Sequence, residues 1–358
     1  MRRRDVLAGA ALAAAAGPAP AAPAPGGSVR RLTMVTEWPD GPGLLPSARR
    51  LARTIVAASD GRLEIEVLAA GERVRPFECV DAVAAGVADL AHTHFGYYGR
   101  LSSAFQFYSG VPFGLTPNEL FAWVRAGDGQ ALWDELGARF DVKPLLCGST
   151  GPQMGGWFRE PLDSIEDVGG LRYRMAGLGA EVYRELGAAV VLLPPGDIVQ
   201  ALESGAIDAC EWTGPWLDVE MGLPAVARHY YYPGWHEPTG AVSLAVGRAL
   251  WDGLEPWERR LIEAAADAEY ARSLAEFDAR NAAALARLRA DGEVELRRFD
   301  DASLARFAEI GADVVAAAGE ADALARRIRA SHERFLADAR AWSEVGLGAF
   351  LEARSAAR

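Results

Sequence analysis

Hydrophobic and polar positions along the first third of the chain follow two different periods. Residues 30–38 (RRLTMVTEW) and 63–71 (LEIEVLAAG) alternate as β-strands do, and residues 47–61 (SARRLARTIVAASDG) carry an amphipathic helical pattern between them. Residues 77–94 read as a helix that turns at Gly86 and runs into a strand. Helices that alternate with strands in this way predict an α/β fold with a mostly parallel sheet.

The pattern continues and then begins again. Residues 119–136 are predicted to be helical, and residues 142–149 (VKPLLCGS) return as a strand. From Asp163 a second series starts, in which residues 169–177 and 187–195 are predicted strands with a helix between them. These periods indicate two α/β units in succession.

A short internal match supports two similar units. Residues 82–89 (AVAAGVAD) align with residues 201–208 (ALESGAID) at a constant offset, with Gly86 opposite Gly205. In each copy a helix ends, the chain turns at the glycine and a strand begins. Two lobes of similar structure would explain the match.

The residues that follow the two matched strands are candidate cleft residues, because ligands of open α/β sheets bind beyond the carboxyl ends of the strands. One strand end carries His92, His94, Tyr97 and Tyr98, and the other carries Glu211 and Trp212. His92 and His94 alternate and so share a face. This leaves a metal-binding pair and packing in the core or the cleft wall as alternatives, of which packing is favoured.

Helical periods dominate the last third of the chain. Residues 243–254 are predicted to cross back as a strand and a short helix, and residues 255–292 form one long helix with Pro256 in its first turn. Residues 294–299 (VELRRF) are one more strand, and residues 300–345 are two or three further helices.

Composition narrows the class of partner. Of 358 residues, 50% are hydrophobic and 24% are charged, which is typical of a globular protein. A formal net charge of −12 without a basic stripe argues against a nucleic-acid partner. Cys79, Cys147 and Cys210 lie far apart and show no metal-ligand spacing, so buried thiols are favoured over a disulfide.

The start of the chain reads as an export signal. Residues 1–25 combine a basic start with an apolar stretch, Val6 to Ala16, that is too short to span a bilayer. Arg3 and Arg4 ahead of this stretch fit a twin-arginine signal, against the alternative of a disordered Ala/Pro tail. The sequence therefore predicts export to the periplasm.

Motifs of common enzymes are absent from the sequence. It contains no G-x-S-x-G, P-loop or H-E-x-x-H pattern, and histidine occurs only five times. One enzyme alternative stays open, a periplasmic metal-assisted hydrolase of small carboxylates that would use Glu211, Glu237 and the His92/His94 pair.

Three segments carry a resemblance to a known family. They are GPQMGGWFREPLDSIEDVGGLRYRMAGLGAEVYRELGA (151–188), PPGDIVQALESGAIDACEWTGPW (194–216) and YYYPGWHEP (230–238). Together they resemble the solute-binding proteins of tripartite ATP-independent periplasmic (TRAP) transporters, and the nearest branch is the one that binds 2-oxoacids with a sodium ion. The resemblance implies two α/β lobes hinged by crossing strands, with a long helix that spans both.

The pattern and the resemblance together divide the chain. Residues 1–25 are the signal, residues 29–150 with about 240–254 form lobe I, residues 151–239 form lobe II, and residues 255–358 supply the spanning helix, one strand and C-terminal helices packed on the lobes. The expected fold is a two-lobed, hinged periplasmic binding protein of the α/β class.

The resemblance also assigns ligand contacts. Arg174 in LRYRM matches the arginine that clamps the ligand carboxylate, a role that suits a guanidinium fork, whereas Arg172 fits a surface position better. Gln153 matches a glutamine that contacts ligand and ion. Tyr97 and Tyr98 match a tyrosine pair that donates to the carboxylate, and which of the two faces the ligand is left open. The segment HTHFG before them departs from the family pattern, so the size and shape of the ligand stay open.

An ion site is implied as well. Glu211 matches a carboxylate ligand of the ion and Trp212 a backbone-carbonyl ligand, with Gln153 and Glu237 as further oxygen donors. Trp212 and Glu237 are also candidate ligand contacts, and sodium is the expected ion, with calcium as the alternative. Glu211 and a ligand carboxylate would balance Arg174 and a monovalent cation, whereas without the cation Glu211 would face the ligand unpaired.

The implied function is capture of a small organic acid in the periplasm and its delivery to TRAP membrane subunits, without catalysis. A homodimer through the C-terminal helices is a further candidate partner. Tyr230, Tyr231, Tyr232 and Trp235 are expected to pack at the hinge rather than to cage the ligand. The alternatives are the metal-assisted enzyme described above and a binding protein that serves a signalling receptor.

Overall fold

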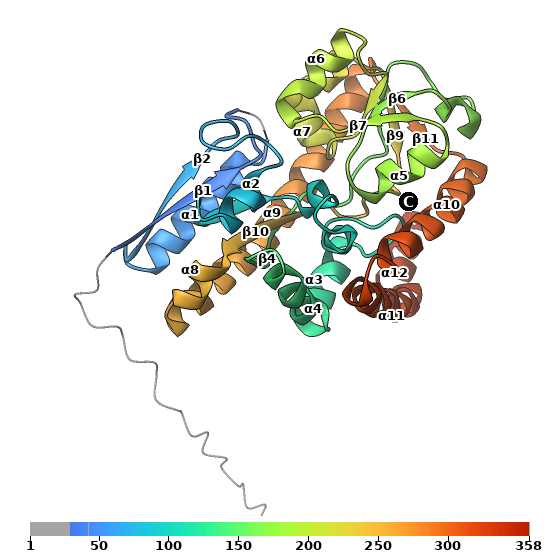
Figure 1. Ribbon diagram of the computed structural model, residues 1–358. Coiled ribbons are helices and arrows are strands. Elements are labelled where there is room, and N and C mark those ends of the chain that lie inside the picture. Colours follow the sequence, from blue (N-terminus) through green and yellow to red (C-terminus); the bar gives the residue numbers. More distant parts are fainter. Residues whose placement is uncertain (1–28, 42, 358) are drawn as a thin grey trace, which may run out of the picture.

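Two β-sheets organise the structure, a computed structural model that describes residues 29–41 and 43–357. The predicted signal at residues 1–25 lies outside the described residues. The first sheet has the order β2 (Leu63–Leu68), β1 (Arg30–Thr36), β3 (Leu90–Thr93), β10 (Ala241–Gly247) and β4 (Val142–Ser149). The second has the order β11 (Glu295–Arg298), β9 (His229–Tyr232), β5 (Gly156–Phe158), β8 (Ala209–Cys210), β6 (Arg172–Arg174) and β7 (Ala189–Val191). Figure 1 shows the two sheets in separate lobes.

Both sheets are mixed, because β10 in the first sheet and β5 in the second run antiparallel to the strands on either side of them. β1 pairs in parallel with β2 and β3, as the helix–strand alternation predicts, and β10 runs antiparallel to β3 and β4. In the second sheet β6 is parallel to β7 and β8, and β5 is antiparallel to β8 and β9. β10 follows the second lobe in sequence but lies inside the first sheet, so the chain crosses between the lobes before β5 and again before β10.

Helices cover the sheets and join the lobes. The α-helices are α1 (Leu45–Ala58), α2 (Cys79–Ala84), α3 (Pro117–Ala126), α4 (Gly129–Ala138), α5 (Gly177–Glu185), α6 (Ile198–Glu203), α7 (Pro215–Met221), α8 (Arg248–Gly253), α9 (Pro256–Asp291), α10 (Asp301–Gly319), α11 (Ala323–Val345) and α12 (Leu347–Ala356). Short 3₁₀ turns are η1 (Phe95–Tyr98), η2 (Ser103–Tyr108), η3 (Ile165–Val168), η4 (Pro195–Asp197) and η5 (Leu223–Ala225). Helix α9 contacts β4 and α1 in one lobe and α7 in the other, so the predicted spanning helix is confirmed.

Local sequence sets the limits of these helices. Helix α9 starts with Pro256 and a capping box between Glu255 and Glu258, and it stops at Gly292, whose φ of 69° lies in the left-handed region. The single helix predicted over residues 119–136 is wrong, since α3 and α4 divide there. A Cβ on Gly127 would lie 2.8 Å from the Trp123 carbonyl oxygen, so the close turn between the two helices needs glycine.

The internal match proves to be a structural repeat. Residues 82–89 and 201–208 each end a helix, α2 or α6, and lead into a strand, β3 or β8. Gly86 and Gly205 both have φ of 71°, a left-handed conformation that ends the helix and redirects the chain. The predicted similarity of the two lobes is therefore confirmed at this turn.

The aspartate that closes each copy makes the same contact. Asp89 accepts a hydrogen bond at 2.8 Å from the Thr33 amide, and Asp208 accepts one at 3.0 Å from the Arg172 amide. In both lobes the acceptor comes from the helix–strand turn and the donor from the neighbouring parallel strand. Each aspartate thus fixes the start of the strand whose other end reaches the cleft.

One apolar cluster extends from the first sheet into the second lobe, where it includes Trp157, Leu202 and Tyr230, and a second cluster joins residues of the second sheet to α5 and α10. Cys79, Cys147 and Cys210 are free and buried, which confirms their prediction as buried thiols. Trp235 is buried and stacks on Phe307 with ring centroids 4.2 Å apart, so it is a packing residue, as expected. Within the described part of the chain, no helix is both long and apolar enough to cross a membrane.

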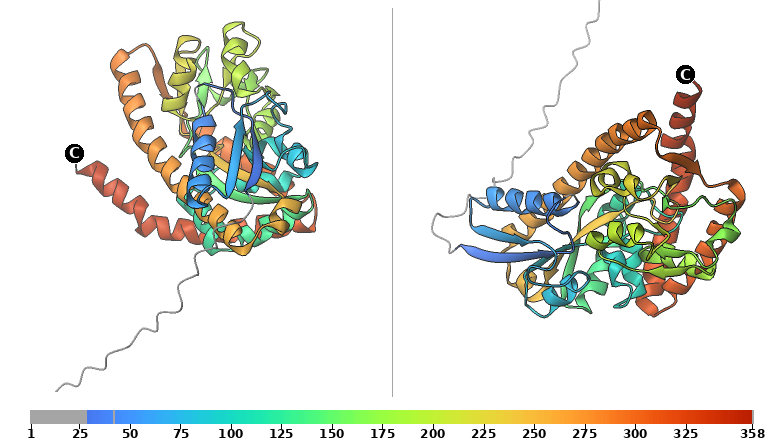
Figure 2. Two further views of the ribbon diagram at one scale, coloured as in Figure 1. Left: turned by 90° about the vertical axis from the view of Figure 1, so that its left-hand side faces the viewer. Right: turned by 90° about the horizontal axis from the view of Figure 1, so that it is seen from above.

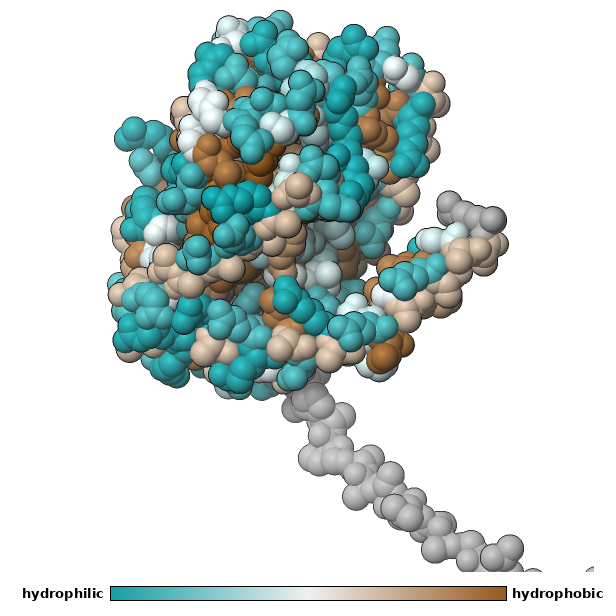
Figure 3. All heavy atoms as spheres, turned by 90° about the vertical axis from the view of Figure 1, so that its right-hand side faces the viewer, coloured by the Kyte–Doolittle hydropathy of each residue, from teal (hydrophilic) through white to brown (hydrophobic). Residues whose placement is uncertain are grey.

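The end of the chain differs from the expected packing on the lobes. Helix α12 buries none of its residues, and it continues α11 away from the body of the molecule (Figure 2). Trp342, Val345 and Phe350 are 71%, 75% and 61% exposed. Figure 3 shows this projecting arm with apolar residues along it.

Asp218 in α7 is a buried acid that orders the second lobe next to the cleft. Its carboxylate accepts hydrogen bonds from Trp157 Nε1 at 2.8 Å, Tyr230 OH at 2.7 Å and the Thr213 amide at 3.1 Å. Trp157 and Tyr230 stack with their centroids 3.9 Å apart. Burial raises the pKa of Asp218 to about 6, although these hydrogen bonds lower it in part.

We expect an unusual pH dependence from Asp218. Because its pKa is higher in the folded state than its ordinary value of 3.8, the folded state holds the extra proton between about pH 4 and 6, and stability falls as the pH rises through this window. Relative to Asp218→Asn, the wild type should lose roughly 3 kcal/mol of unfolding free energy across it. Urea unfolding at several pH values measures this difference, and parallel curves for the two proteins would contradict it.

Candidate functional site

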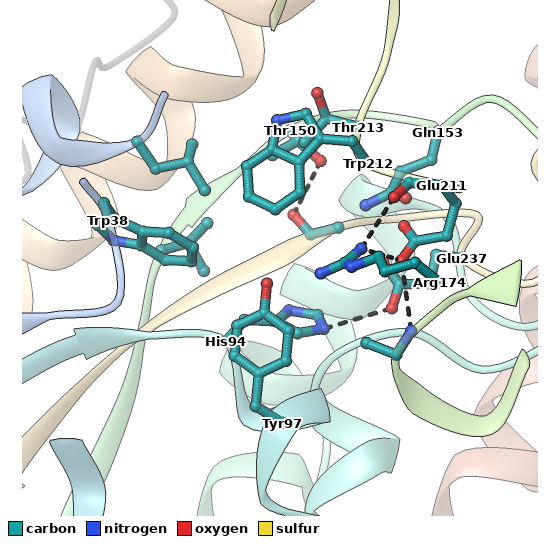
Figure 4. A pocket seen from close by; sticks show the side chains of 14 residues that line it. Trp38, His94, Tyr97, Thr150, Gln153, Arg174, Glu211, Trp212, Thr213 and Glu237 are labelled. Carbon is teal, nitrogen blue, oxygen red and sulfur yellow. Dashed lines mark hydrogen bonds and ion pairs between the residues drawn. The ribbon is translucent and has the colours of Figure 1, made fainter. Parts of the chain in front are cut away.

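A cavity of about 30 Å³ lies where the two lobes meet. Its lining comes from the first lobe, from the crossing segments and from the second lobe. These residues are Trp38, Leu44, His94 and Tyr97; Thr150, Gln153, Glu237, Gly240 and Val242; and Arg174, Ala176, Glu211, Trp212 and Thr213. Figure 4 shows Gln153, Arg174, Glu211 and Glu237 on one side of the cavity and Trp38 on the other.

Arg174 and Glu211 form a buried ion pair in this cavity. Arg174 is 1% exposed and Glu211 3% exposed. Arg174 Nη1 donates to Glu211 Oε1 at 2.5 Å and to the Glu211 carbonyl oxygen at 2.8 Å, and Nε donates to the Leu193 carbonyl at 3.2 Å. Burial acts to raise the pKa of Glu211, but Arg174 and further hydrogen bonds hold that pKa below its ordinary value. The carboxylate is therefore ionised.

The ion pair changes the expected charge balance. Sequence analysis assigned the neutralisation of Glu211 to a bound cation, whereas the structure places Arg174 against it. Half of the guanidinium fork is left for a ligand, because Nη2 of Arg174 is buried and has no hydrogen-bond partner within the described residues. Arg172, two residues earlier, is paired with Asp208 at the surface, as its predicted position implies.

Glu237 is held from the first lobe by His94. His94 Nε2 lies 3.3 Å from Glu237 Oε1, and Nδ1 donates to the Ala241 carbonyl at 2.9 Å. Burial acts to lower the pKa of His94, but the charge of Glu237 and its hydrogen bond raise that pKa above its ordinary value. The contact brings an acid of the crossing segment against the end of β3.

The two tyrosines and the two histidines point in different directions. Tyr97 lines the cavity, whereas Tyr98 turns away from it and donates to Glu37. His94 lines the cavity, but His92 accepts a hydrogen bond from Trp38 Nε1 at 2.7 Å behind the wall. Burial lowers the pKa of His92 to about 3, so it is neutral. His92 is therefore a packing residue, as the favoured interpretation predicted. The rings of His92 and His94 point in different directions and do not form a metal-binding pair.

Oxygen donors for a cation do gather in the cavity. Gln153 Oε1 is buried and has no hydrogen-bond partner in the described chain, and the backbone N–H of Gln153 donates to the Glu237 carbonyl at 3.4 Å. Glu211, Glu237 and the Trp212 residue line the same cavity. No group of three or more His, Cys, Asp and Glu residues in the described ranges is arranged as a metal cluster. This set fits a weakly held hard cation that also takes oxygen atoms from a ligand.

Sequence reasoning missed several cavity residues. Trp38 follows the end of β1, so the strand-end rule that found Tyr97 and Glu211 would also have found it. Thr150 follows the end of β4, and Thr213 comes after Glu211 and Trp212 at the end of β8, so the same rule points to both. Leu44 and Val242, which add apolar surface, had no comparable signal.

Comparison with known proteins shows which family the chain belongs to. Residues 34–322 match the bacterial extracellular solute-binding protein family 7 (DctP). The chain belongs to this family. A monocarboxylate 2-oxoacid-binding periplasmic protein of Nostoc is 35% identical over an alignment of 352 positions that covers 96% of each chain.

Solved structures agree in fold. A TRAP transporter solute-binding protein of Bordetella bronchiseptica, a dimer with copurified calcium and picolinate at one site, superposes with a TM-score of 0.89 at 32% identity, covering 93% of this chain and 98% of that one. A TRAP protein of Pseudoalteromonas atlantica with bound sodium and pyruvate gives 0.87 at 28% identity, covering 91% and 99%.

Membership of this family tests several expectations from the sequence. The protein is an extracytoplasmic solute-binding component of a TRAP transporter that works with TRAP membrane subunits, and the predicted two-lobed fold is confirmed. It is a binding protein and not an enzyme, so the metal-assisted hydrolase alternative is set aside. The receptor alternative gives way to transport for the same reason.

The ion pair predicts a large effect of Glu211→Gln on stability. This change would leave Arg174 buried without its counter-charge. We expect the free energy of unfolding to fall by about 3–5 kcal/mol. Chemical denaturation without ligand measures it. Glu64→Gln, which breaks the exposed pair with Arg31, is the control and should change stability little.

If both variants unfold at the denaturant concentration of the wild type, the pair contributes no net stability and the assignment of Arg174 as its essential counter-charge is wrong.

Proposed function

We propose that this protein binds a small 2-oxoacid such as pyruvate, together with a sodium ion, in the cavity between its lobes and delivers it to the TRAP membrane subunits. One observation carries the proposal. The unpartnered Nη2 of buried Arg174 and the unpartnered Oε1 of buried Gln153 line one cavity beside the ionised Glu211. A carboxylate satisfies the first and a hard cation the second.

The ligand carboxylate would take the free side of the Arg174 fork. Tyr97 adds a hydroxyl donor, because burial raises the pKa of its phenol well above the ordinary value and keeps it protonated. The Arg174 guanidinium lies over the Trp212 ring, 5.6 Å from its centroid, so Trp212 supports the fork from one side. These residues hold and orient the acid without changing it chemically.

The cation would lie between the protein and the ligand. Glu211, Gln153, Glu237 and the backbone carbonyl of Trp212 are the protein donors we assign to it. A hard cation supplies a positive charge that oxygen atoms of the acid can share. Arg174 and a monovalent cation then balance Glu211 and the ligand carboxylate, while His94 pairs with Glu237.

Small ligands suit the rest of the lining. Trp38, Leu44 and Val242 are buried apolar residues of the same cavity, on the side where Figure 4 shows Trp38. The cavity volume of about 30 Å³ leaves little free space beside these side chains, which excludes an acid with a long tail on this side. The Nostoc relative supports the same class by its name, and neighbours from Pseudoalteromonas atlantica and Colwellia psychrerythraea contain pyruvate with sodium and with calcium.

We expect sodium to tighten pyruvate binding. Cation and ligand share one site in the proposal, so sodium should strengthen pyruvate binding by the factor by which pyruvate strengthens sodium binding. Calorimetric titration of pyruvate in sodium and in choline buffers of equal ionic strength measures it, with calcium removed beforehand. Equal affinity in the two buffers would contradict the shared site.

Two neighbouring arginines provide matched variants for this titration. Arg174→Lys keeps the charge but loses the fork, and we expect pyruvate to bind at least about tenfold more weakly. Arg172→Lys lies on the same strand at the surface and should bind like the wild type. Binding by Arg174→Lys that equals binding by Arg172→Lys would remove Arg174 as the carboxylate anchor.

Export and assembly belong to the proposal as well. Arg3 and Arg4 before the apolar stretch of residues 1–25 support a twin-arginine route to the periplasm. The exposed apolar arm formed by the end of α11 and by α12 supports a homodimer, because apolar surface of this kind favours burial against a partner. The Bordetella neighbour is a dimer.

If the arm forms the dimer interface, substitutions in it should lower the mass of the protein in solution. Trp342→Ser together with Phe350→Ser should convert a dimer into a monomer in light scattering coupled to size exclusion, and pyruvate affinity should stay within about twofold because the arm lies outside the cavity lining. Val87→Ser, exposed in the first lobe, is the control and should leave the mass unchanged. A monomeric wild type would contradict the dimer.

A further inference from the structure

Two fully buried residues lie directly behind the first-lobe wall of the cavity. Trp38 and Tyr97 line the cavity, and their sequence neighbours Glu37 and Tyr98 point the other way, into the core. Glu37 and Tyr98 are both 0% exposed. The Tyr98 hydroxyl donates a short hydrogen bond to Glu37 Oε1 and accepts one from the Val80 amide at 3.2 Å.

The bond joins two segments that each carry one wall residue. Glu37 and Trp38 follow β1, whereas Tyr97 and Tyr98 end the turn η1 after β3. The Trp38 and Tyr97 rings lie 6.5 Å apart between centroids and are tilted by 57°, so neither ring fixes the other by stacking. On the far side Phe77, with φ of 68°, places its ring 4.8 Å from Tyr97.

The surroundings of Glu37 favour a neutral carboxyl. Thr93, Cys79 and Tyr98 face it, and among the described groups that shift its pKa there is no cation. Burial raises the pKa of Glu37 to about 7, although the hydrogen bond from Tyr98 lowers it in part. His92 beside the wall is neutral.

Charged groups lie farther out. Glu78 and Asp81 flank Cys79 at the start of α2, and the Arg100 guanidinium lies 5.7 Å from the centroid of the Tyr98 ring, on the side where it pairs with Asp81.

We propose that Glu37 and Tyr98 are a positioning pair for the ligand site: their hydrogen bond holds Trp38 and Tyr97 as one preformed wall against the bound acid. This inference rests on the proposed function, since the wall serves the ligand that the cavity takes. A wall that is already ordered spares the ligand the cost of ordering two large side chains. Neither Glu37 nor Tyr98 lines the cavity, so neither is among the residues assigned to contact the ligand.

A double-mutant cycle with pyruvate in sodium chloride tests the pair. Tyr98→Phe and Glu37→Leu should each weaken pyruvate binding about fivefold to tenfold, and the double variant should weaken it no further, because either change already breaks the bond. Glu37→Gln can still accept from Tyr98 and should bind like the wild type at pH 6. Tyr108→Phe, which removes a buried first-lobe hydroxyl that donates to Gly129 away from the cavity, is the control and should have no effect.

The pH dependence of pyruvate binding distinguishes a positioning role of Glu37 and Tyr98 from simple packing. As the pH rises from 6 to 8.5 the wild type ionises Glu37, and the hydrogen bond that Tyr98 donates to it becomes charge-assisted and stronger, so the affinity of the wild type for pyruvate should rise relative to that of Glu37→Gln, in which this group cannot titrate. The comparison removes the contribution of His94, which both proteins share. Additive losses in the cycle, or Tyr98→Phe binding like Tyr108→Phe, would overturn the pair.

A wild type that does not bind pyruvate would instead refute the proposed function. The pair then has a readout of its own, the emission of Trp38, obtained as the difference between each protein and its Trp38→Phe derivative. A spectrum changed by Tyr98→Phe and not by Tyr108→Phe supports the pair, and an unchanged spectrum overturns it.

Discussion

Arg174 and Glu211 bring two opposite charges into a space that is almost closed to water, with side-chain exposures of 1% and 4%. Burying either charge alone costs several kcal/mol, so each residue depends on the other and on further hydrogen bonds. The backbone supplies the geometry. Parallel pairing of β6 with β8 sets Arg174 opposite Cys210, and the Glu211 amide donates to the Arg174 carbonyl at 3.2 Å. The second sheet thus positions the pair before any ligand is considered.

A second acid in the same cavity is balanced from the opposite lobe. Glu237 belongs to the segment that crosses back into the first sheet, and His94 at the end of β3 lies against it. Two carboxylates that share one cavity repel each other unless each has a basic partner. The cleft therefore links both lobes electrostatically, with one ion pair inside the second lobe and one between the crossing segment and the first. Ligand and cation enter a site whose protein charges are already matched.

Short sequence patterns predicted much of the fold, because the same helix-to-strand turn occurs in both lobes. Gly86 and Gly205 end helices in the left-handed conformation, and Asp89 and Asp208 then bind the neighbouring strand. These features depend on backbone conformation and on contacts to one adjacent strand, which a short sequence match reflects. The strand-end rule then directs attention to the cleft, and it correctly placed Tyr97, Glu211 and Trp212 at the cavity.

The sequence by itself determined the α/β class, the long helix, the repeat and the strand ends, because these follow from hydrophobic period and turn chemistry within short windows. Tertiary structure alone decided which of Tyr97 and Tyr98 faces the cavity, since both end one short turn, from which Tyr98 reaches Glu37 and Tyr97 reaches the cavity. It also decided that Arg174 neutralises Glu211 and that His94 and Glu237, distant in sequence, form a pair. Such contacts join side chains from separate elements, and only the packing of those elements brings them within reach.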